Sequence, residues 1–240
     1  NHLTIYSEYA QLLGDTTNPY EVNKLSMPEH FSAFDDQLGY GVIPFGIKGD
    51  WNNVSMSIDY RENSKNFLFS YWDQNYDHNR VIINSSNQLE TKESMLYKYG
   101  ESNGMKFSIS SNLFKVLNLS LSYQHLNGER WIEANVDNLT VPGIGSNYES
   151  IENNSFFAKI DLNTAKIMKV RIAEIFYQQT HSDQIFDFDP SENTLFGYNM
   201  GLELADNMVF ILKGRKTYQL NEENKFEPIK TTQIETQIIF

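Results

Sequence analysis

Apolar and polar residues alternate along much of this chain. In the segment 54–61, for example, the even positions carry apolar side chains as far as Tyr60, and the odd positions carry polar ones. Successive side chains of a β-strand point to opposite faces, so this alternation is typical of a strand with one apolar and one polar face. No long segment fits the helical period better. The pattern therefore predicts an all-β protein.

Ten segments of this kind are predicted as strands. The regular ones are 54–61, 105–110, 117–124, 156–163, 196–204 and 233–240, and the less regular ones are 3–12, 38–48, 167–179 and 208–218. Glu174 interrupts the alternation of 167–179, so we expect a β-bulge or a position covered by protein there. If 92–100 and 130–140 also pair, the number of strands rises to twelve.

The connections between these strands alternate in length. Short connections follow residues 48, 114, 163 and 205, and long polar stretches occupy about 13–37, 63–103, 127–153, 180–193 and 219–228. In an antiparallel up-and-down sheet, every second connection lies at the same end. The sequence thus predicts tight turns at one end and long loops at the other, which is the arrangement of outer-membrane barrels.

The last segment, 233–240, alternates apolar with polar residues and ends on Phe240. It resembles the final strand of Gram-negative outer-membrane β-barrels, which the barrel assembly machinery reads. The resemblance implies one domain, 1–240, that forms an antiparallel up-and-down transmembrane β-barrel of about 10–12 strands in the bacterial outer membrane. Its expected partners are outer-membrane lipid, lipopolysaccharide and, during biogenesis, the barrel assembly machinery.

Aromatic residues recur near the ends of the predicted strands. Tyr9, Tyr60, Tyr123, Tyr177 and Tyr218 lie toward the long loops, and Trp51, Phe114 and Phe240 lie toward the short turns. Amphipathic rings prefer the boundary between membrane and water, so two such rows predict the aromatic girdles of a membrane barrel. The alternative is that tyrosine is simply a good strand residue.

Composition narrows the function classes. The formal charge of −12 argues against a nucleic-acid partner, and the absence of cysteine excludes disulfides and cysteine metal sites. No apolar run reaches the roughly 18 residues of a membrane-spanning helix, whereas a spanning strand needs only about 9–11 residues. The chain begins at Asn1 without a signal peptide, so we expect it to be processed, trimmed or a fragment.

If the apolar residues face lipid, the polar residues line the interior of the barrel. The predicted pore-lining residues are Asp59, Arg61, Lys106, Lys159, Asp161, Lys169, Arg171, Glu203, Lys213 and Arg215, with Glu8 and Glu235 on the same face. Buried charges require partners or water, so we expect ion pairs between neighbouring strands. In a soluble β-sandwich the same residues would form the exposed face, because alternation alone does not say which face meets solvent.

The predicted number of strands sets the width of such a barrel. About eight strands leave an interior just filled by side chains, so a barrel of ten to twelve is expected to be narrow or plugged. The start of the chain, Asn1-His2-Leu3, reads like the second arm of a hairpin. Missing upstream strands of a larger barrel, or a homo-oligomer, are therefore alternatives.

Two loop segments hold candidate chemistry. Asp183, Asp187, Asp189 and Glu192 form a dense acidic cluster whose oxygen atoms suit Ca²⁺, although the spacing is not that of an EF-hand. The aromatic-rich stretch 67–80 could stack on a sugar, fold inward as a constriction, or pack its own rings over the barrel mouth. It also contains Asp77 and His78, a candidate hydrolase pair.

No established catalytic motif accompanies these residues, since HExxH, GxSxG and phosphate-binding loops do not occur. Ser122 and His125 are close in sequence, but their odd spacing predicts opposite faces of a strand. We therefore expect a porin-like channel or structural membrane protein without catalysis or a resident cofactor. The alternatives are a secreted glycan-binding β-sandwich and an outer-membrane hydrolase with a loop-borne Asp/His site. The sequence does not indicate the solute.

Overall fold

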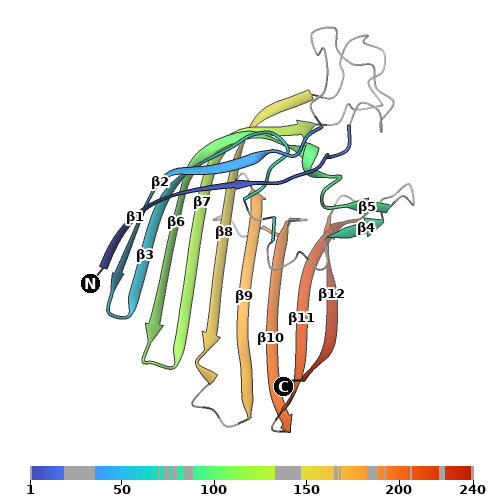
Figure 1. Cartoon of the computed structure of the whole chain (residues 1–240). Coiled ribbons are helices and arrows are strands. Elements are labelled where there is room, and N and C mark those ends of the chain that lie inside the picture. The colour runs from blue at the N-terminus through green and yellow to red at the C-terminus, as the bar shows by residue number, and fades with distance from the viewer. Residues whose placement is uncertain are drawn as a thin grey trace.

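The structure is a computed structural model. It describes residues 2–18, 36–69, 71–72, 76, 80–83, 89–132, 147–164, 167, 169–182, 189–191, 193–205, 207–221 and 225–238. Ten strands form one antiparallel sheet in which every strand pairs with its neighbours in chain order, apart from a small separate hairpin (Figure 1). The prediction of an all-β, up-and-down arrangement is confirmed.

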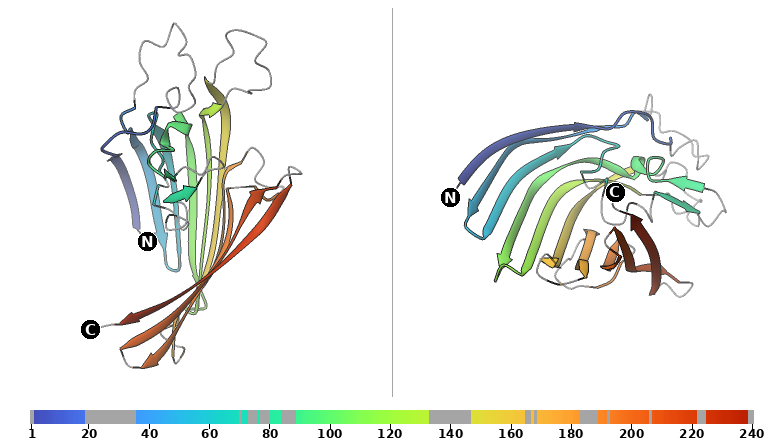
Figure 2. Two further views of the ribbon diagram at one scale, coloured as in Figure 1. Left: turned by 90° about the vertical axis from the view of Figure 1, so that its right-hand side faces the viewer. Right: turned by 60° about the horizontal axis from the view of Figure 1, so that its bottom comes forward.

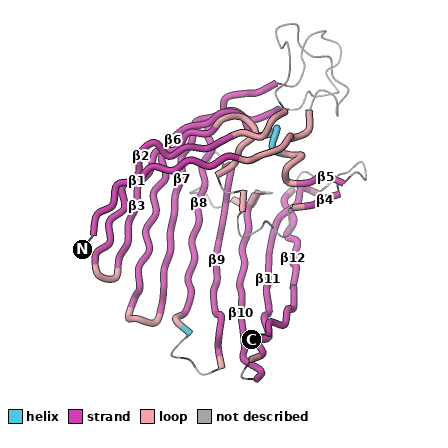
Figure 3. Tube along the Cα trace, viewed as in Figure 1, coloured by secondary structure: helices cyan, strands magenta, loops and turns pink. Residues whose placement is uncertain are grey.

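The strands of the sheet are long. They are β1 (His2–Gln11), β2 (Tyr40–Trp51), β3 (Val54–Asn63), β6 (Tyr99–Leu113), β7 (Leu117–Ile132), β8 (Asn147–Leu162), β9 (Val170–Ser182), β10 (Thr194–Ala205), β11 (Met208–Leu220) and β12 (Phe226–Ile238). The separate hairpin is β4 (Val81–Ile83) and β5 (Leu89–Thr91), and one short helix, η1 (Leu96–Lys98), precedes β6. Figure 3 shows how little of the chain is helical.

The predicted extra segments do not add separate strands within the described residues, but their ends belong to β6 and β7, where Tyr99 pairs with Arg130. Residues 92–98 form turns and η1, and 99–100 begin β6. Residues 130–132 end β7, and the remainder of 130–140 lies outside the described residues. β6 and β7 extend well past the predicted 105–110 and 117–124, and their polar ends pair from Ser102–Gly128 onward and, after a register shift, at Tyr99–Arg130. These ends contain Gly100, Gly104 and Gly128, which interrupt the apolar alternation that revealed the central parts.

The sheet has one apolar face and one polar face. Ile58 lies beside Ile47 and Phe107 on the apolar face, whereas Asp59 lies beside Lys106 on the polar face. Phe107 is 51% exposed, although it sits in the middle of the sheet. The described residues place no second layer over the apolar face. A large apolar surface is therefore left uncovered.

The sheet is strongly curved, and the segment between β3 and β6 lies on the inside of the curve (Figures 1 and 2). Phe69 and Trp72 of this segment line one cavity with Lys106 and Gln124, so the polar face is the one on the inside of the curve. β1 pairs only with β2, and β12 pairs only with β11, so the ten described strands do not close into a ring. Most residues of these two strands are exposed on both faces. A long strand edge without a partner is a ready template for pairing with another strand.

The β-bulge expected in β9 is present, and it restores the alternation around Glu174. The register against β10 shifts between the pairs Gly201–Ile172 and Leu202–Val170. After this shift, Glu174 faces the polar side, opposite Asp161 on β8 and beside Asn199 on β10. One inserted residue exchanges the two faces for the rest of the strand. A single alternation of apolar and polar positions therefore does not fit the whole of 167–179.

At the long-loop end, the chain between β3 and β6 packs into the hollow. Phe67, Tyr71 and Leu96 are buried there, and Tyr97 packs against Trp131 of β7 with ring centroids 6.2 Å apart. This segment is anchored to the first loop as well, since the hydroxyl of Thr16 donates to the carbonyl of Glu93 at 2.8 Å. Within the described residues, Tyr97 and Trp131 form a buried apolar cluster against which Tyr148 packs. Within the described ranges, no helix is long and apolar enough to cross a membrane.

Candidate functional site

A group of bonded polar residues on β1, β3 and β7 occupies one part of the polar face. Asp59 is only 4% exposed, and its carboxylate accepts from Arg61 Nε at 2.5 Å and from the Tyr6 hydroxyl at 3.2 Å. Arg61 Nη1 also donates to Gln124 Oε1 at 3.1 Å, and its guanidinium lies 4.8 Å from the ring centroid of Phe69. The buried carboxylate thus has the partners that a charge removed from water requires.

A second network crosses β7 to β11. Lys159 Nζ lies 3.4 Å from Asp161 and 3.3 Å from Glu174. Asn118 Nδ2 donates to the other oxygen of Asp161 at 2.7 Å, and Asn199 bonds to Glu174 on the next strand. Polar side chains on adjacent strands are therefore linked across the width of the sheet, as the expected cross-strand ion pairs require.

The network continues to the last strands. Arg215 Nη1 donates to Asn199 Oδ1 at 2.9 Å, and its guanidinium lies 4.8 Å from the ring centroid of Phe176. Phe176 is 1% exposed and covers Gly197, where a Cβ atom would lie 2.4 Å from the ring. A side chain at position 197 would displace the ring that supports Arg215.

The remaining predicted pore-lining residues fall into three groups. Arg171 pairs with Glu203 at 2.5 Å, and Lys213 pairs with Glu235 at 2.7 Å. Lys106 faces the hollow beside Asp59 and Gln124. Lys169 lies in the turn before β9, is exposed and has a φ of 67°, so it is not part of the strand that was predicted to carry it. That these residues line a pore stays a prediction.

A cavity of about 290 Å³ opens on the polar face above β6 to β9. Its floor includes Lys106, Gln124 and Phe157, and its roof is formed by Phe69 and Trp72 from the segment after β3. The aromatic rings of this segment also contact each other, with Phe67 and Phe69 at 5.2 Å between centroids. The segment therefore both packs its own rings and enters the hollow, as two of the sequence hypotheses proposed.

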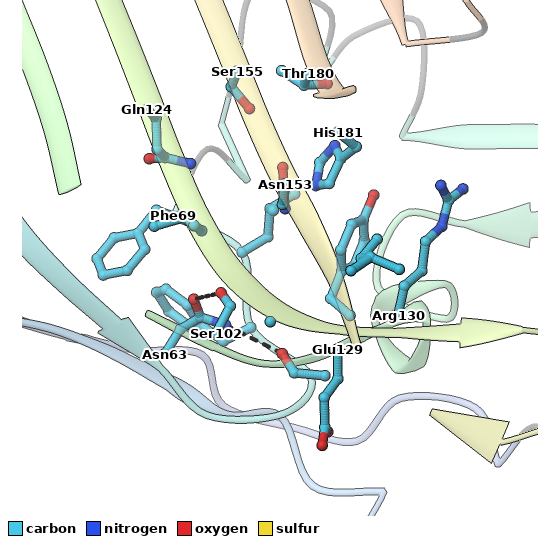
Figure 4. Close-up of a pocket in the computed structure, with 17 residues that line it drawn as sticks. Asn63, Phe69, Ser102, Gln124, Glu129, Arg130, Asn153, Ser155, Thr180 and His181 are labelled. Carbon is cyan, nitrogen blue, oxygen red and sulfur yellow. Dashed lines mark hydrogen bonds between the residues drawn. The ribbon is translucent and has the colours of Figure 1, made fainter. Parts of the chain in front are cut away.

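A smaller, more enclosed cavity of about 30 Å³ lies nearer the long loops (Figure 4). Among its lining residues, the hydroxyl of Ser102 donates to Asn63 Oδ1 at 2.5 Å. His181 at the end of β9 also lines it, four residues beyond Tyr177, and its ring centroid lies 4.9 Å from that of Tyr99 with the two rings tilted. Its Nδ1 is sealed from solvent, and the residue as a whole is half-buried. Desolvation, with smaller contributions from Arg130 and Lys92, lowers the pKa of His181 to about 4.

The described aromatic residues of the predicted girdles that lie on strands share the apolar face, and Phe114 lies in the turn after β6. Tyr60 pairs with Phe45, Tyr123 with Phe107, and Tyr177 with Ala158 on that face. Tyr9 stacks on Tyr40 at 5.8 Å and is 63% exposed, and Tyr218 lies on β11. At the short-turn end, Trp51 is 45% exposed and Phe114 is 93% exposed. Phe240 lies outside the described residues. A role of these rings in a membrane boundary stays a prediction.

The candidate chemistry of the loops is mostly outside the described residues. Asp183, Asp187 and Glu192 belong to that part of the chain, as do Asp77 and His78. Asp189 is exposed, and its carbonyl accepts from Gln179 Nε2 at 3.0 Å. The described residues contain no group of three or more metal-ligating side chains. Calcium binding and a hydrolytic site therefore stay predictions.

Ser122 and His125 lie on opposite faces. Ser122 lines the cavity on the polar side, whereas His125 is opposite Met105 and its Nδ1 lies 2.6 Å from Asn154 Oδ1. This arrangement gives no serine–histidine pair.

Sequence reasoning missed several polar-face residues that the structure brings together. Glu174 was noticed only as an interruption, although a second run of alternation in the opposite phase over 172–180 signals its true face. Gln124 and Asn199 were passed over because they are uncharged, yet each links two strands. No protein-family model, curated protein or solved structure matches this chain.

Proposed function

We propose that this chain forms the wall of a bacterial outer-membrane β-barrel with a porin-like role and no catalysis. The observation that carries the proposal is the contrast between the faces of one sheet. Large apolar side chains such as Phe107, Ile175 and Met200 stand exposed on one side, at 51%, 52% and 46%. On the other side, charged residues are bonded across neighbouring strands. Lipid on the apolar face and water on the polar face would satisfy both.

The curvature supports the same proposal. The sheet is curved (Figure 2), and the segment after β3 on the inside of the curve shares a cavity with Lys106 and Gln124 of the polar face, so closure of the curve would place the ion pairs around an interior. β1 and β12 each present an unpaired edge, and closure requires that these edges pair with each other or with further strands. A barrel removes strand edges that would otherwise be exposed to lipid.

The alternative of a soluble glycan-binding sandwich is less well supported. A sandwich buries the apolar face of one sheet against a second sheet, about 10 Å away. Among the described residues, the only other sheet is the hairpin of β4 and β5, whose strands have three residues each. It lies at the long-loop end and leaves the apolar face open (Figure 1).

The membrane proposal is tested by fractionation. The chain should require detergent for extraction and should migrate faster on a gel before boiling than after, because a folded barrel resists the denaturant. A protein that stays in solution without detergent and shows no shift in mobility would support the sandwich instead.

Conduction is tested separately in planar bilayers. Arg171 is the better residue for charge reversal, since its side chain is 55% exposed, whereas Arg215 supports Phe176 and Asn199. Arg171→Glu should shift the reversal potential in a KCl gradient toward cation preference. Lys225→Glu, at an exposed position in the last loop, is the matched control and should leave the potential unchanged. If the protein inserts into the bilayer but no conductance is measured, the channel role is refuted and a structural role remains.

A further inference from the structure

The cavity above β6 to β9 has the size and position of a ligand site. Its volume of about 290 Å³ lies near the lower end of the range for small-molecule pockets, roughly 300–1,000 Å³. The floor is built by side chains of β6 to β9, and Phe69 and Trp72 of the segment after β3 line the opposite side. Such a volume suits a ligand with one ring.

The floor presents hydrogen-bond donors. Lys106 faces the cavity, and no ion pair or hydrogen bond of its ammonium group is found among the described residues. Its cross-strand neighbour Asp59 is already bonded to Arg61 and Tyr6. Within the described part of the chain, the ammonium group of Lys106 therefore has no carboxylate bonded to it.

Gln124, directly opposite Lys106 on the neighbouring strand, adds to this polarity. Its Oε1 accepts from Arg61 Nη1 at 3.1 Å, which fixes the amide so that its Nε2 hydrogens remain for another partner. The hydroxyls of Ser122, Ser155 and Thr180 also line the cavity and can donate or accept. The described lining contains no carboxylate. A ligand placed here therefore has to supply acceptors and a negative charge.

The roof favours an apolar body. Phe69 and Trp72 cover the cavity, Phe157 contributes to the floor, and Trp72 keeps 71% of its surface exposed. Aromatic rings in these positions offer flat surfaces for a ring or a chain of similar width. The site therefore combines apolar surfaces with donors concentrated at one end.

We propose that this cavity binds small organic monocarboxylates with a ring-sized apolar body. The carboxylate accepts from Lys106 Nζ and Gln124 Nε2, and the apolar body lies between Phe157 and the rings of Phe69 and Trp72. A neutral sugar fits less well, because it would leave the charge of Lys106 without a counter-ion. The inference rests on the polar face and its loop, and binding does not depend on whether the barrel conducts.

The test is isothermal titration of the whole chain, purified in detergent, at neutral pH. The probe is cyclohexanecarboxylate, and the controls are the neutral cyclohexanecarboxamide and glucose. We expect measurable binding of the carboxylate only. Equal binding of the amide, preference for glucose, or no binding of the carboxylate would overturn the proposal.

Three variants locate the site. Lys106→Met should weaken binding of the carboxylate at least about tenfold, since it removes a charge-assisted hydrogen bond, and Lys106→Arg should largely restore it. Lys48→Met is the matched control on the same face, since Lys48 pairs with Asp50 near the short turns, and should bind as the parent does. If Lys106→Met loses its heat-modifiable mobility, Gln124→Glu serves instead, because the added charge repels the ligand. Unchanged binding in a folded variant would refute the site, whereas loss of conductance with intact binding would refute only the channel.

Discussion

On β6, Phe107 and Ser108 are neighbours in the chain but belong to different surfaces. Phe107 projects with Ile58 and Tyr123 from the apolar face, where it is 51% exposed. Ser108 lies between Ser57 and Ser122 on the polar face. The apolar side chains are the more exposed ones, which is the reverse of a soluble protein. The difference shows that this sheet exposes its apolar face and links the side chains of its polar face to one another.

The largest difference between the two faces is expected when one charge is added to each of them. Phe107→Lys should destabilise the protein in lipid by about 2–4 kcal/mol, because a charge near the middle of the lipid-facing band loses hydration. Ser108→Lys, its neighbour on the polar face, should cost less than about 1 kcal/mol. Urea titration of the protein folded in phosphatidylcholine vesicles measures both. Equal costs would mean that the two faces meet the same surroundings.

The polar face contains both a half-buried network of ion pairs and more exposed ion pairs, and Lys159 tests the contribution of the network. Lys159→Met leaves Asp161 and Glu174 without their shared cation, so we expect a loss of about 1–3 kcal/mol in the free energy of unfolding. Lys48→Met removes an ion pair whose side chains are 51% and 45% exposed, and should cost about 0–1 kcal/mol. The same urea titration compares them. A larger effect at Lys48 would contradict the view that the network in the hollow holds the sheet.

His181 extends the comparison of the two faces to the long-loop end, where its Nδ1 is sealed from solvent. The pKa of His181 is about 4 in the folded state and about 6.5 when unfolded, so the folded state binds fewer protons. Its contribution is complete above pH 6.5 and is lost as the pH falls toward 4. Because His181 as a residue is only half-buried, the effect is discounted to an expected loss of about 1–2 kcal/mol over that range.

The control for this effect is His181→Asn, which tolerates the positive φ of 54° at this position. The difference in unfolding free energy between pH 7 and pH 4 should be smaller in the variant by that amount. Carboxylates that titrate in the same range affect both proteins alike. Parallel pH profiles would show that His181 is hydrated.

The smallest expected effect separates the edges from the middle of the sheet. β1 and β12 are exposed on both faces and each lacks one neighbour, whereas β7 and β8 are paired on both sides. In the membrane-bound protein, closure of the barrel pairs both edges, so amide hydrogens of β1 and β12 should be protected to within about tenfold of those of β7 and β8. Exchange at β1 and β12 that is much more than about tenfold faster would mean that the edges stay unpaired in the membrane and would contradict closure.

The sequence predicted the strands and the face of most residues, because period-two alternation is a local property. The locations of Ile58, Lys106 and Asp161 follow from it directly. The faces of the residues on β9 could not be predicted from alternation alone, because the bulge before Glu174 changes the phase by one residue. The sequence showed only an interruption at this point. Lys169 lies in the turn, because β9 begins only at Val170.

The cavity could not be predicted in the same way. It depends on where the segment after β3 folds, and the rings of Phe69 and Trp72 reach β6 to β9 only through tertiary contacts. The alternation places Lys106 and Gln124 on one face, but it does not say that Arg61 occupies the oxygen of Gln124. Relations between residues far apart in the chain need the structure.

The most direct test of the account is a spin-label scan along β3, which is feasible because the chain has no cysteine of its own. Single cysteines at positions 55–60 are labelled in the vesicle-bound protein, and their accessibility to oxygen and to a water-soluble nickel chelate is measured. We expect oxygen accessibility to peak at Met56, Ile58 and Tyr60, and chelate accessibility to peak at the positions between them. Chelate accessibility that peaks at the apolar positions, or no periodicity at all, would contradict the proposal that lipid covers the apolar face.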